Sequence, residues 1–539
     1  MTLNPFRKIY SRLLLLRAKH KSLQGHPRLA LKLARWVPAC RYGETSFFSS
    51  DSAPHEIQKR RRAGFERLSE LFRQRFAKSI ALSDELETCI SDLSFVNTHR
   101  VPFQYQHYVA DHLRIGSIVE KTDGPRIQDI DGNWSYDIGG SYGVNLFGSE
   151  FYKRCIDRGV ERAREIGLVL GPYHPLIADN VARLKRISGL DEVSFHMSGT
   201  EAVMQAVRLA QYHTNRSHVV RFSGAYHGWW GEVQAGIGNP RPARDTYTLK
   251  EMHSDTLRVL RTRDDIACVM VNPLQAMNPN AVPPCDMALV ASNRSAHFDK
   301  SSYADWLQQL RQVCTARSIV LIFDEVFLGF RLALGGAQEY FGVKADMVTY
   351  GKSVGGGLPV GVVCGKSRFM RRYNDSRPMD ICFARGTFNS HPYVMATMNE
   401  FLRHLDEPDV RGSYEQLDAL WNGRAHDLNR HLERFGLPVR VANLTSVWTT
   451  LYTRPGCYNW MFQYYLRAEG LALSWIGTGR FIFSHDLDDD DFNEIANRFV
   501  AAAQSMEADG WWWNDARLTN KAIKQRVLKE LLGARLKMT

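Results

Sequence analysis

A short, continuous apolar run that ends in two acids limits the folds open to this chain more than any other feature. The run is Ile319–Phe323, and Asp324 and Glu325 follow it directly. Strands that are buried on both faces of a parallel sheet have this pattern. Open α/β sheets place their functional groups at the carboxyl ends of such strands. The run therefore predicts a buried parallel strand with a carboxylate site at its C-terminal end.

The pattern along the chain predicts one α/β body with extensions at both ends. Arg126–Asp137 is typical of a hairpin with an Asp-Gly turn, and helices then alternate with short apolar strands to about residue 400. Strands such as Val447–Tyr452 return between later helices. We expect a helical basic N-terminal extension (1–98), the N-terminal segment of a small domain (99–170), a large domain (171–400), a small C-terminal domain (401–505) and a C-terminal helical extension (506–539).

The N-terminal extension carries most of the net charge of +12, with fourteen Lys or Arg and three acids in residues 1–62. We expect amphipathic helices from Pro27 to Trp36 and from His55 to about Ser79. A basic arm can meet an acidic acyl-carrier protein or an anionic membrane surface, and a solvated helical face is the plain alternative. No aromatic–basic platform accompanies the charge, so nucleic-acid binding is not expected.

The cysteines and the short apolar runs bear on the compartment. The nine cysteines are scattered, with no CxxC and no Cys/His spacing suited to zinc, which indicates free thiols, a reducing compartment and no bound metal. Leu13–Leu16 is far too short to span a bilayer. We therefore expect a cytoplasmic location. The basic arm is the segment that could attach the protein to a membrane surface without crossing the membrane.

One lysine stands in a glycine-rich turn that a helix would not favour. Lys352 lies between Gly351 and Ser353, and three glycines and a proline follow shortly after it. A lysine that keeps its charge in water is the plain alternative. A lysine that forms a Schiff base, together with an acid that holds a protonated pyridine nitrogen, is the pattern of pyridoxal phosphate (PLP) enzymes. Lys352 and Asp324 predict such a site.

Two longer strings around these residues resemble a known family. Asp324–Gly342 and Gly351–Gly361 are similar to class III PLP-dependent aminotransferases of fold type I, and most similar to their glutamate-1-semialdehyde aminomutase branch. The resemblance covers roughly residues 100 to 505. It implies an α/β fold with a mostly parallel seven-stranded sheet in the large PLP-binding domain and a small α/β C-terminal domain, to which the helical extensions are added.

The resemblance also implies roles for the central residues. Lys352 would carry the cofactor as a Schiff base and then move a proton, and Asp324 rather than Glu325 would hold the pyridine nitrogen. For Glu325 a helix cap or an ion pair is the plain interpretation. Tyr226 would stack on the cofactor ring and His227 would complete that motif. A core tyrosine beside a turn is the alternative for Tyr226.

Two further motifs of the family concern the cofactor phosphate. Ser198, Gly199 and Thr200 open a helix, whose N-terminal N–H groups bind anions, although Ser198 and Glu201 also fit a capping box. Thr387 corresponds to the threonine that reaches the phosphate of the neighbouring subunit. It therefore implies a homodimer with shared active sites, and a helix-capping threonine is the alternative.

A last segment of the family motif concerns the cofactor ring. Gln275 would bond the ring hydroxyl of the cofactor. Asn272 stands where the family usually has a glutamate, so one negative charge is missing near the site.

The reaction expected from the resemblance moves an amino group from an amino-acid or amine donor to an aldehyde or ketone. Segment Val101–Tyr108 holds aromatic residues and no arginine for a substrate carboxylate. Tyr142 stands where the aminomutase branch tends to carry tryptophan. The hypothesis is an apolar acyl or polyketide-type acceptor. The alternatives are a glutamate-1-semialdehyde-type intramolecular amine shift, another PLP reaction such as racemisation, and a non-catalytic binding subunit, which the presence of Lys352 and Asp324 disfavours.

Overall fold

The chain divides into two compact units, and each is described by itself. The computed structural model describes residues 5–21, 23–93, 101–115, 118–231, 233–234, 239, 243–280, 298–474 and 480–536. The first unit holds the described residues of Met1–Arg35, Phe151–Val282 and His297–Leu417, and the second those of Trp36–Glu150 and Asp418–Thr539. The five segment boundaries expected above remain a prediction.

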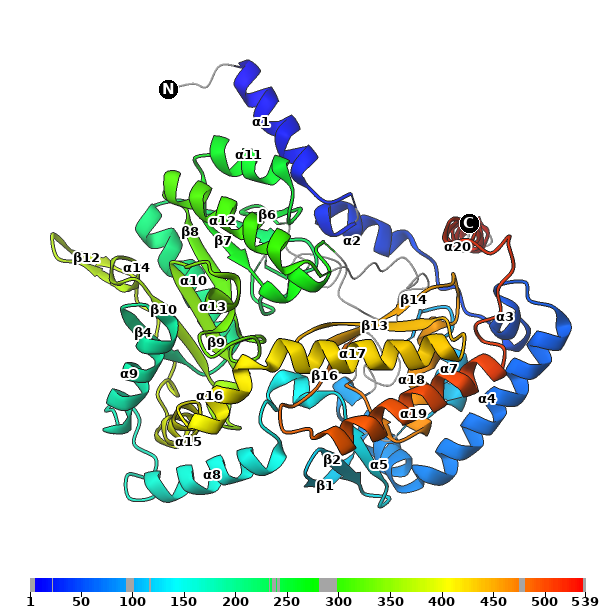
Figure 1. Ribbon diagram of the computed structural model, residues 1–539. Coiled ribbons are helices and arrows are strands. Elements are labelled where there is room, and N and C mark those ends of the chain that lie inside the picture. The colour runs from blue at the N-terminus through cyan, green and yellow to red at the C-terminus, as the bar shows by residue number, and fades with distance from the viewer. Residues whose placement is uncertain are drawn as a thin grey trace. The chain divides into compact units, whose positions relative to one another are not determined.

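The first unit is built on a seven-stranded sheet of order β4-β10-β9-β8-β7-β5-β6 (Figure 1). The strands are β4 Glu192–His196, β5 His218–Phe222, β6 Thr246–Leu249, β7 Ile266–Val271, β8 Val320–Asp324, β9 Met347–Gly351 and β10 Gly361–Gly365. Strand β10 runs antiparallel to β4 and β9, and the other neighbours are parallel. The predicted mostly parallel, seven-stranded sheet is confirmed.

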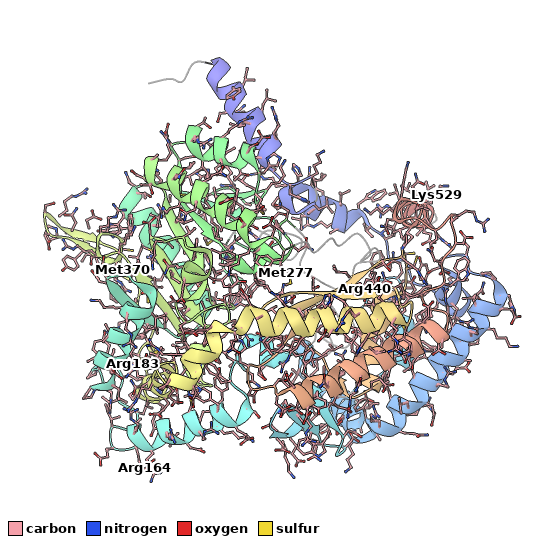
Figure 2. The ribbon with its side chains drawn as sticks, in the orientation of Figure 1. Arg164, Arg183, Met277, Met370, Arg440 and Lys529 are labelled. Atoms are coloured by element: carbon pink, nitrogen blue, oxygen red, sulfur yellow. The ribbon has the colours of Figure 1, made fainter. Side chains whose placement is uncertain are left out.

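The sheet is buried on both faces, as the apolar runs predict. Every residue of β7, β8 and β9 is buried, and successive side chains of a strand point to opposite faces. One face is covered by α10 (Gly199–Thr214), whose Ala202 and Ala206 pack with Met270 and Ile322. Met370, labelled in Figure 2, belongs to the same core.

Helices surround this sheet, and a small hairpin extends from it. The helices are α1 Pro5–Ala18, η1 Leu23–Gly25, α2 Pro27–Trp36, α8 Ser149–Ala163, α9 Leu176–Ser188, α10, α11 Ser254–Thr262, η3 Pro273–Met277, α12 Lys300–Ala316, α13 Gly336–Phe341, η5 Lys352–Gly355, α14 Ser367–Met370, α15 Pro392–His404 and α16 Pro408–Glu415. The hairpin is β11 Tyr373–Asn374 with β12 Arg377–Ile381. Helix α1 packs along α11, and Lys19 forms a bridge with Leu249 of β6.

The second unit combines two small sheets with the terminal helices. Its helices are α3 Glu44–Ser49, α4 His55–Arg75, α5 Ala77–Glu87, α7 Gln106–His112, η2 Gly140–Gly143, α17 Leu417–Arg434, η6 Asn459–Met461, α18 Phe462–Ala468, α19 Asp489–Ala508 and α20 Asn520–Leu536. Its sheets are β1 Val119–Asp123, β2 Arg126–Asp129, β3 Trp134–Asp137 and β15 Leu471–Ala472, and β13 Val439–Leu444, β14 Val447–Tyr452 and β16 Phe481–Ile482. The pairing of β2 with β3 confirms the predicted hairpin.

Two expectations for this unit are wrong. The helix expected from His55 to about Ser79 ends at Arg75, because Phe76 leaves the helical conformation (φ −116°, ψ 28°) and buries its ring beside Phe72. Segment Val101–Tyr108, with its aromatic residues and no arginine, was expected beside the substrate. Tyr105 instead is fully buried, with its ring centroid 4.9 Å from that of Trp460.

A buried arginine joins the N-terminal helices of this unit to its C-terminal segment. The Arg61 side chain is fully buried, and its guanidinium donates to Asp51 at 2.6 and 2.8 Å and to the Gly510 carbonyl at 2.9 Å. The guanidinium carbon also lies 4.4 Å from the ring centroid of Tyr458. These contacts satisfy a charge that would otherwise be costly to bury.

Arg61→Met is expected to destabilise the second unit by roughly 3–5 kcal/mol, because it leaves the Asp51 carboxylate buried without its partner. A melting temperature lower by about 10 °C in a calorimetric scan would record this loss. The matched control is Arg62→Met, since Arg62 is 41% exposed and pairs with Glu44 at the surface. Equal shifts for the two variants would contradict the argument.

A buried acid in the first unit makes stability depend on pH. Burial raises the pKa of Glu251 to about 8, although the Tyr303 hydroxyl donates to its Oε1 at 2.7 Å. Between about pH 4.5 and pH 8 the folded chain therefore holds a proton that the unfolded chain has lost. Stability falls with rising pH in this window, by about 1.4 kcal/mol per pH unit for one proton.

Glu251→Gln is expected to remove the part of this pH dependence that Glu251 contributes, while Glu325, whose pKa burial also raises to about 8, keeps its own part. The variant and the parent should melt alike near pH 5, and the variant should melt higher near pH 8. Melting temperatures measured across this range, with the exposed Glu415→Gln as control, check the prediction. Parallel curves for parent and Glu251→Gln would refute it.

Candidate active site

The structure brings Asp324 and the start of the Lys352 turn to the same edge of the sheet. Asp324 is the last residue of β8, and Lys352 directly follows β9. The two strands are parallel, with Asp324 opposite Thr349, so both chains leave the sheet at their carboxyl ends side by side. This is the edge at which open α/β sheets bind ligands.

Three groups fix the Asp324 carboxylate, which is 4% exposed. His227 Nδ1 lies 2.8 Å from Oδ2, and the Thr349 hydroxyl and the Val326 N–H each donate to Oδ1 at 3.2 Å. Sequence reasoning did not single out Thr349. The sequence offered one indication: Thr349 lies two residues before Gly351, near the end of the strand that precedes Lys352. In the structure Thr349 is paired with Asp324, and their side chains form a hydrogen bond.

Glu325 has a different environment from its neighbour. Its side chain is fully buried and its Oε2 accepts from the Ala337 N–H at 2.7 Å, at the start of α13. Burial raises the pKa of Glu325 to about 8, and the backbone N–H groups of Ala337 and Gln338 limit the rise. A Cβ on Gly336 would lie 2.1 Å from Oε2, so glycine is required there. The helix-cap interpretation of Glu325 is confirmed.

Lys352 has an unusual backbone conformation. Its φ is +51°, in the left-handed region that a lysine rarely adopts and that costs of order 1–3 kcal/mol. The side chain is half-buried, with Nζ 5.3 Å from the ring centroid of Phe327. The glycines that follow allow close packing, since a Cβ on Gly356 would lie 2.3 Å from the Thr397 carbonyl oxygen. Strain held by packing at a strand end is typical of functional sites.

The N-terminus of α10 meets these strand ends. A Cβ on Gly199 would lie 2.4 Å from Val326 Cγ1, and a Cβ on Gly228 would lie 2.7 Å from the Thr200 hydroxyl. The capping alternative is realised in part: Ser198 Oγ accepts from Glu201 N at 3.3 Å, while Glu201 Oε2 accepts from the Met197 N–H at 3.0 Å rather than from the Ser198 N–H of a full capping box. The cap leaves the other N–H groups of the first turn and the Thr200 hydroxyl at a helix end suited to a phosphate.

Tyr226 offers an exposed ring beside the buried acid. The tyrosine is 60% exposed, and partial burial together with the charge of Asp324 raises its pKa. Its carbonyl accepts from Asn272 Nδ2 at 3.1 Å, while Asn272 Oδ1 accepts from Leu274 N at 3.2 Å. The sequence showed Asn272 only as a missing charge. In the structure the residue both donates and accepts, which a glutamate carboxylate cannot do.

Among the predicted cofactor-binding residues that the structure describes, two buried polar atoms lack a hydrogen-bond partner. They are His227 Nε2 and Gln275 Oε1, on residues that are 1% and 7% exposed. Such groups in a native protein call for a ligand, an ion or water. Together with the Tyr226 ring, the fixed Asp324 and the start of α10, they fit a planar, phosphate-bearing cofactor such as PLP.

Two candidates from the sequence remain, Thr387 in the first unit and Tyr142 in the second. Thr387 is exposed in a turn, and a Cβ on the preceding Gly386 would lie 3.8 Å from Glu201 Oε2. Tyr142 belongs to the second unit, in η2, where it is 46% exposed with a φ of +57°. The roles of both stay predictions.

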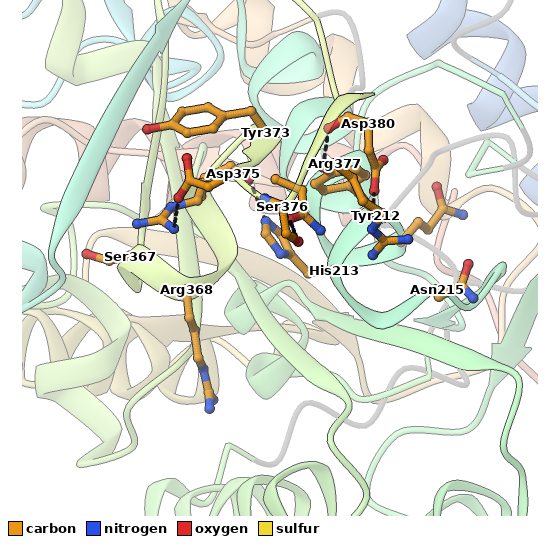
Figure 3. A pocket seen from close by; sticks show the side chains of 13 residues that line it. Tyr212, His213, Asn215, Ser367, Arg368, Tyr373, Asp375, Ser376, Arg377 and Asp380 are labelled. Carbon is orange, nitrogen blue, oxygen red and sulfur yellow. Dashed lines mark hydrogen bonds and ion pairs between the residues drawn. The ribbon is translucent and has the colours of Figure 1, made fainter.

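A large polar cavity of about 1080 Å³ lies elsewhere in the first unit (Figure 3). It is formed by the end of α10, by α14 and by the β11–β12 hairpin, and Tyr212 donates to the Asp380 carbonyl at 2.8 Å in its wall. None of the candidate site residues lines it. The volume of this cavity is therefore no guide to the position of the predicted active site.

Comparison with known proteins agrees with this geometry. The class-III aminotransferase family model matches residues 108–278 and 290–502. A glutamate-1-semialdehyde 2,1-aminomutase of Citrifermentans bemidjiense is 30% identical over 426 residues, which cover 72% of this chain and 91% of the relative. A solved transaminase with PLP bound has 25% identity and a TM-score of 0.65, over 80% of this chain and 99% of that chain.

A more distant structure supports the fold alone. A glutamate-1-semialdehyde aminomutase from Pseudomonas aeruginosa PAO1 has a TM-score of 0.67 at 18% identity, over 83% of this chain and 99% of the other. The matched residues agree with the predicted span of roughly 100 to 505. The chain belongs to the class-III aminotransferase family, whose members are PLP-dependent enzymes of the transaminase and aminomutase kind.

Proposed function

We propose that this protein is an aminotransferase that moves an amino group from an amino-acid or amine donor to an aldehyde or ketone. The observation that carries the proposal is the buried Asp324 carboxylate, which His227 and Thr349 fix by hydrogen bonds. Asp324 ends β8, and the neighbouring strand β9 leads directly into Lys352. When bound, PLP supplies an aldehyde that takes up an amine and a ring that withdraws electrons from the adjacent carbon.

The residues of the chain would divide the remaining tasks. Lys352 Nζ would hold the cofactor covalently and later move a proton. The Asp324 carboxylate would keep a proton on the pyridine nitrogen. The Tyr226 ring would cover one face of the cofactor and exclude water, and the Gln275 carbonyl oxygen would accept from the ring hydroxyl. The first turn of α10, at Gly199 and Thr200, would bind the phosphate.

We infer a homodimer with shared sites from Thr387, whose exposed side chain suits contact with a second copy. Thr387→Ala is expected to weaken cofactor binding. Mixing equal amounts of Lys352→Ala and Thr387→Ala subunits, each inactive at limiting PLP, should restore about a quarter of the parent activity, because about half of the dimers are mixed and one of the two sites in each mixed dimer keeps both groups. If Thr387 acted within its own subunit, no activity would return. Unmixed variants are the controls.

The acceptor is proposed to be apolar, of the acyl or polyketide type. Support comes from Tyr142, which stands where the aminomutase branch tends to carry tryptophan. The second candidate is an intramolecular amine shift on glutamate-1-semialdehyde, which the names of the relatives favour. A non-catalytic role has less support because Lys352 and Asp324 are both present.

A single assay separates the two catalytic candidates. The purified holoenzyme is given amino donors one at a time, and bleaching of its visible absorption identifies a donor. Glutamate-1-semialdehyde is then supplied without any donor. Turnover that requires an external donor and acts on apolar aldehydes supports the aminotransferase. Efficient formation of 5-aminolevulinate without a donor would replace it with the aminomutase.

A further inference from the structure

The first two helices expose apolar side chains at helical spacing. In α1 the exposed residues are Ile9, Leu13 and Leu16, at 56%, 55% and 57%. In α2 they are Leu29 and Leu33, at 50% and 37%, with Trp36 at 39% on the last turn. Both sets follow the spacing i, i+4, i+7, which places each set on one helix face.

Helix α1 uses its two sides differently. Leu14 and Ala18, at 4% and 0% exposure, form the buried side of a helix that packs along α11. At 3.6 residues per turn, the exposed stripe of Ile9, Leu13 and Leu16 lies opposite that side. Arg12 borders the stripe on one edge and Arg17 on the other. The apolar stripe is therefore not needed for packing within the described unit.

Helix α2 also exposes an apolar stripe, and a basic stripe runs beside it along the helix. Ala30 is buried, and Leu29, Leu33 and Trp36 occupy one half of the exposed side. The basic residues Arg28, Lys32 and Arg35 follow the same spacing on the other half. Apolar residues ending in a tryptophan beside a basic stripe are typical of helices that lie in the plane of a membrane surface.

The charge of this segment is of one sign. Residues 1–43 contain ten Lys or Arg and neither Asp nor Glu. An anionic surface attracts such a segment, by roughly fivefold in binding for each basic residue close to it. No helix in the part of the chain that the structure describes has the length and hydropathy to cross a bilayer. The uniform positive charge of this segment suits attachment to an anionic surface.

We propose that α1 and α2 bind the enzyme to an anionic lipid bilayer, with Leu29, Leu33 and Trp36 entering the interface. The sequence left an acidic carrier protein open as the other occupant of this segment. The basic residues of the segment would be sufficient to bind such an acidic protein. The two exposed apolar stripes call for a surface that also removes them from water, and a bilayer offers this together with negative charge.

The test is sedimentation of the full-length holoenzyme with vesicles of phosphatidylcholine, alone or with about 30% phosphatidylserine. We expect binding to the anionic vesicles that weakens as salt rises. The apolar variant Leu29→Ser/Leu33→Ser/Trp36→Ser should lower the partition coefficient about tenfold or more. The basic variant Arg28→Gln/Lys32→Gln/Arg35→Gln should lose the preference for anionic vesicles.

A matched control uses exposed apolar residues outside the two helices. Leu420→Ser/Phe435→Ser, at positions that are 40% and 54% exposed, should bind vesicles like the parent. Cofactor absorption and melting temperature show that each variant is folded. The proposal is overturned if the parent does not sediment with anionic vesicles. It is also overturned if the basic variant loses binding while the apolar variant keeps it, since charge alone would then account for the contact, as with an acidic protein.

Discussion

Replacing Lys352 with alanine is expected to abolish covalent attachment of PLP and to reduce turnover by at least about 10³-fold. The reason is that only a primary amine at this position can both hold the cofactor aldehyde and carry a proton at the reacting carbon. Borohydride reduction followed by peptide mapping should mark Lys352 in the parent and no residue in the variant. Loss of the visible absorption of the lysine-bound cofactor gives a second readout.

The control for this prediction is Lys344→Ala, because Lys344 is exposed on the same unit and should change neither measurement. A lysine substitution that only perturbed folding would lower the melting temperature of the variant. Reduction that marks another lysine in the parent would contradict the assignment of Lys352.

The second large effect is expected from Asp324→Asn, which should lower kcat/KM by roughly 10²–10³-fold. An amide cannot keep a proton on the pyridine nitrogen, and it would also disturb the bonds to His227 and Thr349. Steady-state kinetics with the best donor, and titration of the cofactor-free protein with PLP, measure the two consequences.

The adjacent acid provides an internal control. Glu325 has its pKa raised to about 8 by burial, so below that pH its side chain is already neutral. Glu325→Gln keeps an oxygen for the Ala337 N–H and should leave kcat/KM nearly unchanged at neutral pH. Equal losses for Asp324→Asn and Glu325→Gln would mean that the two acids do not have the separate roles that their environments indicate.

Much of the large unit could be predicted from local sequence. The apolar run before Asp324 predicted a strand buried on both faces, and β8 is fully buried in a mostly parallel sheet. The string around Lys352 predicted a turn rather than a helix, and a short 3-10 turn follows β9 there. These features were readable because burial on both faces and glycine-rich turns restrict the residue types directly.

Contacts between distant segments could not be predicted in the same way. The bond from Thr349 to Asp324 depends on the register of two strands, and the bond from Asn272 to the Tyr226 carbonyl joins two loops. The burial of Tyr105 against Trp460 joins segments that are 355 residues apart. In each case the residue type allowed several environments, and packing selected one of them.

For this protein the sequence alone determined the class of sheet, the order of the motifs and the pair of residues, Asp324 and Lys352, to which we assign the chemistry. Only the tertiary structure decided that Glu325 caps a helix while Asp324 is held by His227 and Thr349, and that α1 and α2 leave apolar faces exposed. The physical reason is that strand burial and turn geometry are set by neighbours in the chain. Hydrogen-bond partners and exposure are set by whichever segments fold against them.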